Sequence, residues 1–226
     1  MTESTQNPRN SLDDLAIQTR ERYSARYASL GRHIRTLGWG SEAQQQIRFT
    51  HTLLPGEDYT QLSILDIGCG FGDYLTFLKS QGLSPAAYTG WDLNPDLLRE
   101  AKALHPNSPN ITFAEENLLS RTSASPPVAD VGVMLGLLNF NWKERYDNAT
   151  YTREALQKAF SLVRKTLIVD FLSNRITPSY PREDFVYYHD PVEMLSYALE
   201  LTNRVVLKQD YPPIPQREFM LILHHE

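Results

Sequence analysis

Residues 64–73 combine three glycines, two carboxylates and a thiol within ten positions. They read Ile-Leu-Asp-Ile-Gly-Cys-Gly-Phe-Gly-Asp, and the apolar residues before the glycines are typical of a buried strand. Glycines let the backbone turn sharply and approach a ligand without a Cβ in the way. Apolar residues at helical spacing follow the turn. A strand, a bare turn and a helix N-terminus predict a site for a nucleoside-bearing cofactor.

The acid ahead of the glycines indicates which cofactor this is. A dinucleotide fingerprint would need a third glycine at position 73, where the chain has Asp73, and no Gly-Lys-Ser/Thr of a phosphate-binding loop follows. The carboxylate of Asp66 would attract a cationic amine and repel a pyrophosphate. S-adenosylmethionine, with its sulfonium and its amino-acid tail, fits these requirements.

A second acid lies 22 positions after Gly70, at the end of a strand expected over residues 86–92. A carboxylate at this place, Asp92, can accept hydrogen bonds from both hydroxyls of a ribose. Asn94 and Pro95 then begin a helix as its N-cap and first residue. Because Asp92 alone would suit NAD equally well, the prediction of S-adenosylmethionine depends on residues 64–73 and 86–92 together.

Residues 65–72 and 91–95 resemble the first and second motifs of the class I S-adenosylmethionine-dependent methyltransferases. The resemblance extends over about residues 60–225. It implies an α/β fold with a Rossmann-like, seven-stranded, mostly parallel sheet in the order 3-2-1-4-5-7-6. The gap at 210–216 is too short for a crossover helix, so the last two strands should pair antiparallel. We expect a disordered tail (1–11), an N-terminal helical lid (12–58) and a methyltransferase core (59–226).

The resemblance also implies roles for single residues in binding the cofactor. The glycine turn should hold the methionyl part, and the second-motif acid should hold the ribose. The acid that usually approaches the adenine falls at Asn117, so either Asn117 or Glu116 could take that place. Together with the end of the fourth strand, the expected cofactor-binding residues of the core are Asp66, Gly68, Cys69, Gly70, Asp92, Leu93, Glu116, Asn117, Leu135 and Gly136.

The lid offers a partner for the carboxylate of the cofactor. A bidentate arginine suits a carboxylate, and Arg48 is the candidate, with Gln44 or Gln45 assisting. Trp39 is expected near the sulfonium. Arg48 could equally be a surface arginine on a docked helix.

Two loops could face the reacting methyl group. Asn139, after the fourth strand, offers an amide to the acceptor or caps the next turn. Tyr187, Tyr188 and His189, after the fifth strand, could wall the acceptor, and His189 could accept its proton because its reference pKa is near neutrality. Alternatively, this segment leads into a helix that Asp190 caps.

Composition narrows the function classes. The formal charge of −5 and the absence of a basic run argue against a nucleic-acid partner. No apolar stretch reaches the length of a membrane span, so we expect a cytoplasmic protein with no membrane partner and leave its oligomeric state open. The histidines lack metal-ligand spacing, so no metal is expected.

The predicted reaction is metal-free, in-line methyl transfer to a small-molecule acceptor. The alternatives are an aminopropyl-type transferase and a non-catalytic S-adenosylmethionine-binding protein.

Overall fold

The structure is a computed structural model that describes residues 8–106, 108–121, 126–178, 180–211 and 217–226. Most of the tail predicted to be disordered, residues 1–7, lies outside these ranges. The remainder of that tail is helical, because the first helix begins at Pro8, four residues before the start expected from the sequence.

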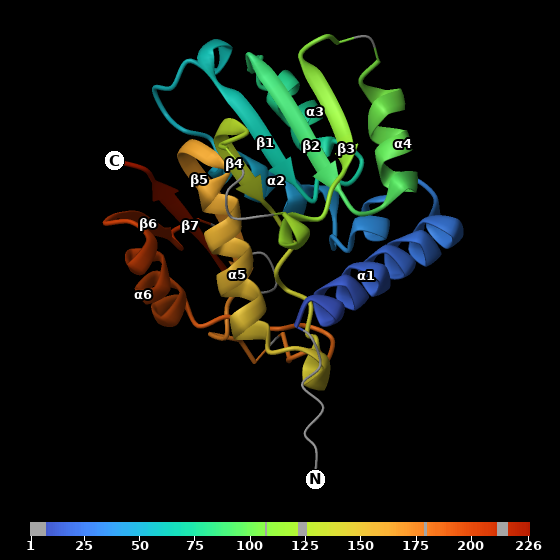
Figure 1. The fold of residues 1–226 in the computed structure, drawn as a ribbon, viewed down its shortest axis with the longest axis vertical. Helices are drawn as coiled ribbons and strands as arrows, with labels where there is room; N and C mark the ends of the chain where they lie inside the picture. The colour runs from blue at the N-terminus through green and yellow to red at the C-terminus, as the bar shows by residue number, and fades with distance from the viewer. Residues whose placement is uncertain (1–7, 107, 122–125, 179, 212–216) are drawn as a thin grey trace.

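Seven strands form one sheet in the order β3-β2-β1-β4-β5-β7-β6 (Figure 1). Strand β7 runs antiparallel to both β5 and β6, and the other neighbours are parallel. This confirms the predicted strand order and the antiparallel pairing at the end. The strands are β1 (Ser63–Ile67), β2 (Ala87–Asp92), β3 (Ile111–Glu115), β4 (Ala129–Met134), β5 (Val163–Leu172), β6 (Arg204–Lys208) and β7 (Glu218–His224).

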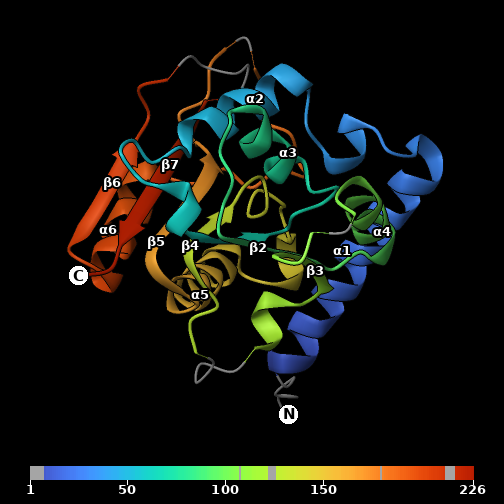
Figure 2. The same cartoon turned by 90° about the horizontal axis from the view of Figure 1, so that it is seen from above.

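Helices cover both faces of the sheet (Figure 2). They are α1 (Pro8–Leu30), α2 (Glu42–His51), α3 (Asp73–Ser80), α4 (Pro95–Leu104), α5 (Asn148–Ser161) and α6 (Pro191–Leu201). Successive side chains of a strand point to opposite faces, so Ile64 packs into the core beneath α2 and α3, whereas Leu65 packs into the core beneath α5 and α6. Both cores hold β1 rigidly and thereby fix the turn that follows it.

Helix α1 lies across the carboxyl ends of β1, β2 and β3 (Figure 1). Arg20 Nε donates a hydrogen bond to the Leu93 carbonyl at 3.1 Å, and Asn94 Nδ2 donates to Ser24 Oγ at 2.9 Å. Arg20 also pairs with Glu115 at the end of β3. These contacts bring the predicted lid helix to the sheet edge where the glycine turn and Asp92 lie.

Candidate cofactor and acceptor site

The turn after β1 has the backbone conformation that its glycines allow. Gly68 and Gly70 have φ angles of 78° and 54°, in the left-handed region that residues with a Cβ rarely adopt. The N–H of Gly68 donates to the Trp91 carbonyl at 2.7 Å, which ties the turn to β2. A Cβ on Gly68 would lie 2.7 Å from Leu137, and a Cβ on Gly70 would lie 2.9 Å from Leu37. The turn therefore requires glycine for its conformation and for its close neighbours.

Asp92 lies at the end of β2, and backbone hydrogen bonds orient its carboxylate. Its Oδ2 accepts from the Gly70 N–H at 2.9 Å and its Oδ1 accepts from the Asn94 N–H at 2.8 Å. Each carboxylate oxygen has a further lone pair, so both can also accept a hydroxyl hydrogen. Burial raises the pKa of Asp92 above its ordinary value.

Asp66 is a buried carboxyl, 4% exposed, on the cavity side of β1. Its pKa is raised to about 7, mainly by burial and also by the nearby Asp92 and Asp73, against the opposing effect of a hydrogen bond from the Tyr88 hydroxyl. A cation placed beside Asp66 would favour its ionised form. The site thus fits the ammonium group of an amino-acid tail.

Cys69 lies in the turn as a buried, protonated thiol. Burial raises its pKa well above the ordinary value, and the carboxylates of Asp66 and Asp92 raise it further. A thiol that stays protonated is a poor nucleophile. Cys69 therefore contributes its small size and its backbone to the turn.

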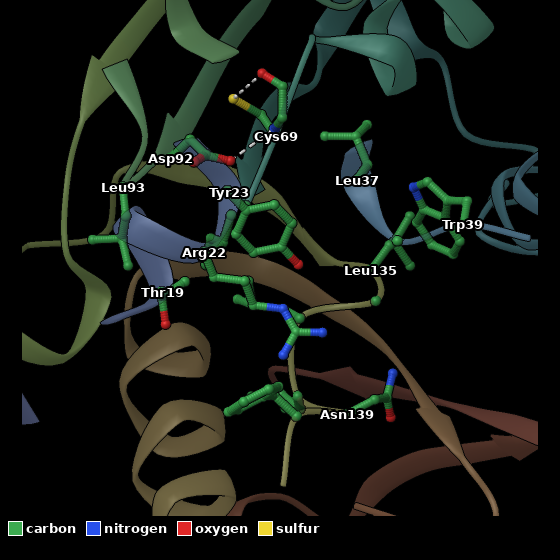
Figure 3. Close-up of a pocket in the computed structure, with 18 of the residues that line it drawn as sticks. Thr19, Arg22, Tyr23, Leu37, Trp39, Cys69, Asp92, Leu93, Leu135 and Asn139 are labelled. Carbon is green, nitrogen blue, oxygen red and sulfur yellow. Dashed lines mark hydrogen bonds between the residues drawn. The ribbon is translucent and has the colours of Figure 1, made fainter. Parts of the chain in front are cut away.

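A cavity of about 770 Å³ runs from the glycine turn, along α1, to the loop after β4 (Figure 3). The predicted cofactor residues come from six separate segments of the chain, and the structure brings all of them to this one cavity. They are Trp39, Arg48, Asp66, Gly68, Cys69, Gly70, Asp92, Leu93, Glu116, Asn117, Leu135 and Gly136.

Helix α1 contributes side chains that sequence reasoning did not select. Thr19, Arg22, Tyr23 and Arg26 line the cavity from one face of the helix. Figure 3 shows Arg22 and Tyr23 projecting between Asp92 on one side and Asn139 on the other. Their spacing of three and four residues places them on a common face, but the sequence does not show that this face turns toward the sheet.

Arg48 lines the cavity but already has two acidic partners. Its Nε lies 3.2 Å from Asp170 Oδ2 and also contacts the carboxylate of Glu218. Its guanidinium stacks over the Trp39 ring, 4.6 Å from the centroid. Asp170 Oδ1 accepts from the Gly136 N–H at 2.6 Å, so this cluster also anchors the loop after β4. Two buried carboxylates already compensate the charge of Arg48, so its contact with a cofactor carboxylate stays a prediction.

The two candidates for the adenine position both lie at the cavity with partners of their own. Asn117 Oδ1 accepts from the Leu119 N–H at 3.0 Å and caps a short 3-10 helix. Glu116 pairs with Arg121 at 3.3 Å, and its backbone N–H donates to the Asp92 carbonyl at 3.1 Å. None of these three interactions involves the Asn117 amide nitrogen, which can still donate to a ligand.

Of the four predicted catalytic side chains, only Asn139 lines the cavity. Its Oδ1 accepts from the Leu172 N–H at 2.8 Å, which fixes the amide plane. Figure 3 shows Asn139 below Arg22 at the cavity. Its amide plane is fixed, and its amide nitrogen takes no part in the bond to Leu172.

The predicted role of residues 187–189 at the acceptor does not agree with their placement. None of Tyr187, Tyr188 and His189 lines the cavity. His189 is 3% exposed, its Nε2 lies 3.0 Å from the Leu138 carbonyl, and burial lowers its pKa to about 4. A neutral, buried imidazole that donates to a carbonyl holds two loops together. The alternative for this segment is confirmed, since Asp190 caps α6 by accepting from the Val192 N–H at 2.8 Å.

Among the residues that the structure describes, no cluster of three or more His, Cys, Asp or Glu side chains is arranged to bind a metal ion. No helix in those ranges is both long and apolar enough to cross a lipid bilayer.

The fold and the sequence are similar to those of known methyltransferases. Residues 64–165 match the family model described as a methyltransferase domain. Rv1506c of Mycobacterium tuberculosis (strain H37Rv), a candidate methyltransferase by name, is 26% identical over 151 residues, which cover 66% of this chain and 86% of that protein.

Solved structures share the fold at low sequence identity. Magnesium protoporphyrin IX methyltransferase from Synechocystis, solved with bound S-adenosylmethionine, has a TM-score of 0.64 at 16% identity, over 100% of both chains. The small RNA methyltransferase HEN1 has a TM-score of 0.61 at 18% identity, over 81% of this chain and 25% of that chain. The family match over residues 64–165, the two sequence motifs and the shared strand order support the resemblance to the class I S-adenosylmethionine-dependent methyltransferases.

Proposed function

We propose that the protein binds S-adenosylmethionine in this cavity, along the ends of β1 and β2. It would then transfer the methyl group of the cofactor to a small-molecule acceptor. The observation that carries the cofactor's placement is the hydrogen bond from Gly70 to Asp92, which joins the expected methionyl and ribose positions in one rigid unit. Asp66 supports it, because a buried carboxyl with a raised pKa is suited to a cationic amine.

Arg26 is the better candidate for the carboxylate of the cofactor. It lines the cavity, and its Nη1 lies 3.2 Å from the position that a Cβ on Gly38 would occupy. The neighbouring Leu37 covers Gly70, so Arg26 lies on the part of the lid next to the glycine turn. Among the described residues no carboxylate forms an ion pair with Arg26, in contrast to Arg48.

The shape of the acceptor end supports a small molecule. Helix α1 and the segment 37–40 line the cavity together with the sheet edge, and the volume of the whole cavity, cofactor part included, is about 770 Å³, within the usual range for small-molecule sites. Aromatic side chains wall the end beyond Asn139, among them Phe140, Trp142, Tyr151 and Phe185. An extended polymer would need a groove that is open along its length.

The side chains at the cavity would act by positioning and by excluding water. When bound, S-adenosylmethionine supplies a methyl group on a sulfonium, which an acceptor atom can displace in line. The glycine turn and Asp92 would fix the direction of approach, and alignment of this kind supplies a large part of the rate enhancement in such reactions. Asn139 would hold the acceptor through its fixed amide donor.

Formation of S-adenosylhomocysteine in the presence of fractionated metabolites tests this function. The protein is incubated with methyl-labelled S-adenosylmethionine and either the low-molecular-weight fraction or total RNA from a bacterial extract. We expect label in low-molecular-weight products together with an equal amount of S-adenosylhomocysteine. Label in RNA would overturn the small-molecule proposal. Turnover only with decarboxylated S-adenosylmethionine would favour an aminopropyl transferase, and binding without any turnover would favour a non-catalytic protein.

A further inference from the structure

We infer that Arg22 anchors a carboxylate of the methyl acceptor, so that the substrate class is small carboxylic acids with an apolar or aromatic body. This inference rests on the proposed function, since it concerns the acceptor end of the same cavity. It assigns a substrate-recognition role to a residue of the lid helix.

Arg22 is held in place by aromatic rings at the acceptor end. Its guanidinium carbon lies 4.4 Å from the centroid of the Phe140 ring and 5.8 Å from that of Phe185. Such contacts between a cation and ring faces fix the guanidinium plane but leave its edge N–H groups free of these rings. Figure 3 shows this side chain reaching from α1 toward Asn139.

The charge of Arg22 has no acidic partner among the described residues. Two other arginines near this sheet edge do have one: Arg20 pairs with Glu115, and Arg48 pairs with Asp170 and Glu218. Burial lowers the pKa of Arg22, and the positive charge of Arg26 adds to this effect, whereas the neighbouring Tyr23 opposes it. A partly buried cation without a counter-ion is costly, and an anionic ligand that enters the cavity would remove this cost.

Arg22 and Arg26 serve opposite ends of the cavity. They are four residues apart on α1, so their side chains start one helical turn apart on the same face. Arg26 lies against Gly38 and the lid over the glycine turn, whereas Arg22 lies against Phe140 after β4. The arrangement provides for two separate anions, one on the cofactor and one on the acceptor.

The side chains around Arg22 indicate the polarity of the rest of the acceptor. Leu138, Trp142 and Tyr151 line the same end of the cavity and offer apolar and aromatic surface. Glu21 and Glu183 also line the cavity, and their negative charge disfavours a ligand with several anionic groups. A ligand with a single carboxylate next to an apolar body would pair its anion with the Arg22 guanidinium and pack its body against the apolar side chains.

Matched pairs of acids and amides test the inference. Phenylacetate, indole-3-acetate and 4-hydroxybenzoate are compared with their primary amides by calorimetry, on protein saturated with S-adenosylhomocysteine. We expect at least one acid to bind on the order of tenfold more tightly than its amide, the usual scale of a charge-assisted hydrogen bond. Arg22→Gln should abolish that preference, and Arg22→Lys should retain part of it.

One control variant and three contrary outcomes complete the test. Arg153→Gln removes an arginine of similar setting, stacked 5.2 Å from the Tyr197 ring outside the cavity, and should leave the preference intact. The inference is overturned if no acid binds, if amides bind as tightly as acids, or if Arg26→Gln rather than Arg22→Gln abolishes the preference. Failure of S-adenosylhomocysteine itself to bind would instead contradict the proposed function.

Discussion

The Asp92 carboxylate accepts a hydrogen bond from the Gly70 N–H at 2.9 Å, although the two residues are 22 positions apart in the chain. One oxygen of the acid after β2 is thus fixed by the turn after β1, and the other is fixed by the Asn94 N–H. The expected methionyl and ribose positions are therefore parts of one rigid element.

Asp92→Ala should weaken the binding of S-adenosylmethionine by at least about tenfold, because hydrogen bonds to a charged group contribute roughly 1.5–3 kcal/mol each. Isothermal titration calorimetry measures the effect. Asp96→Ala is the matched control, since Asp96 lies in the first turn of the adjoining helix α4 and pairs with the exposed Arg99. Unchanged affinity of the Asp92 variant would remove this residue from the ribose role.

Gly70→Val should abolish cofactor binding, because the φ of 54° disfavours a β-branched residue and a Cβ would lie 2.9 Å from Leu37. Gly82→Ala provides the comparison. Gly82 has a similar φ of 74° but no atom within 4 Å of an added Cβ, so this variant should lose only about 1 kcal/mol of stability. Urea unfolding and calorimetry on both variants separate backbone strain from lost binding. Normal binding by Gly70→Val would contradict the proposed turn.

Arg26→Gln should weaken S-adenosylmethionine but leave methylthioadenosine, which lacks the amino-acid tail, unaffected. Arg48→Gln should behave differently, because it leaves Asp170 and Glu218 buried without their cation. Breaking a buried ion pair costs about 3–5 kcal/mol, so this variant should be less stable and should bind all ligands more weakly. Arg35→Gln, an exposed lid variant, controls for charge. A selective loss of S-adenosylmethionine in the Arg48 variant would restore that residue to the carboxylate role.

His189 should affect stability through pH. Its folded pKa of about 4 lies below the ordinary 6.5, so the unfolded chain binds the proton more readily. The stabilisation from this group is complete above pH 6.5 and is lost as the pH falls toward 4, by ~3 kcal/mol at most. His189→Gln, measured by urea unfolding from pH 4 to 8, should remove this component and leave turnover intact. A large loss of turnover with unchanged stability would reinstate His189 as a base.

The glycine turn and Asp92 could be predicted from the sequence because their information is local. Positive φ angles demand glycine at fixed positions, and the end of a parallel strand places its last side chain at the ligand edge. The strand order followed from the family resemblance that these two segments carry. The structure confirms that order.

The partners of Arg48 and the contribution of α1 were not predictable in this way. Glu218 is 170 positions from Arg48 along the chain and meets it only because β7 lies next to β5. Similarly, the residue pattern of α1 does not indicate whether its polar face lies against the sheet edge or in solvent. Both depend on long-range packing, which residue spacing within one segment does not contain.

The direction of the His189 side chain was also decided by tertiary structure. The segment pairs with the end of β5 through a bridge between Ser173 and His189, which turns the imidazole toward Phe171 and the Leu138 carbonyl. A tyrosine pair next to a histidine is compatible with an active site or with a packed helix entry. The burial of the His189 side chain favours the packed helix entry.

A crystal structure with S-adenosylhomocysteine tests the placement of the cofactor most directly. We expect its ribose hydroxyls on the Asp92 carboxylate, its amine beside Asp66 and its carboxylate on Arg26, with the acceptor end open between Arg22 and Asn139. A ligand bound away from the glycine turn, or with its ribose not in contact with Asp92, would contradict the proposed cofactor site.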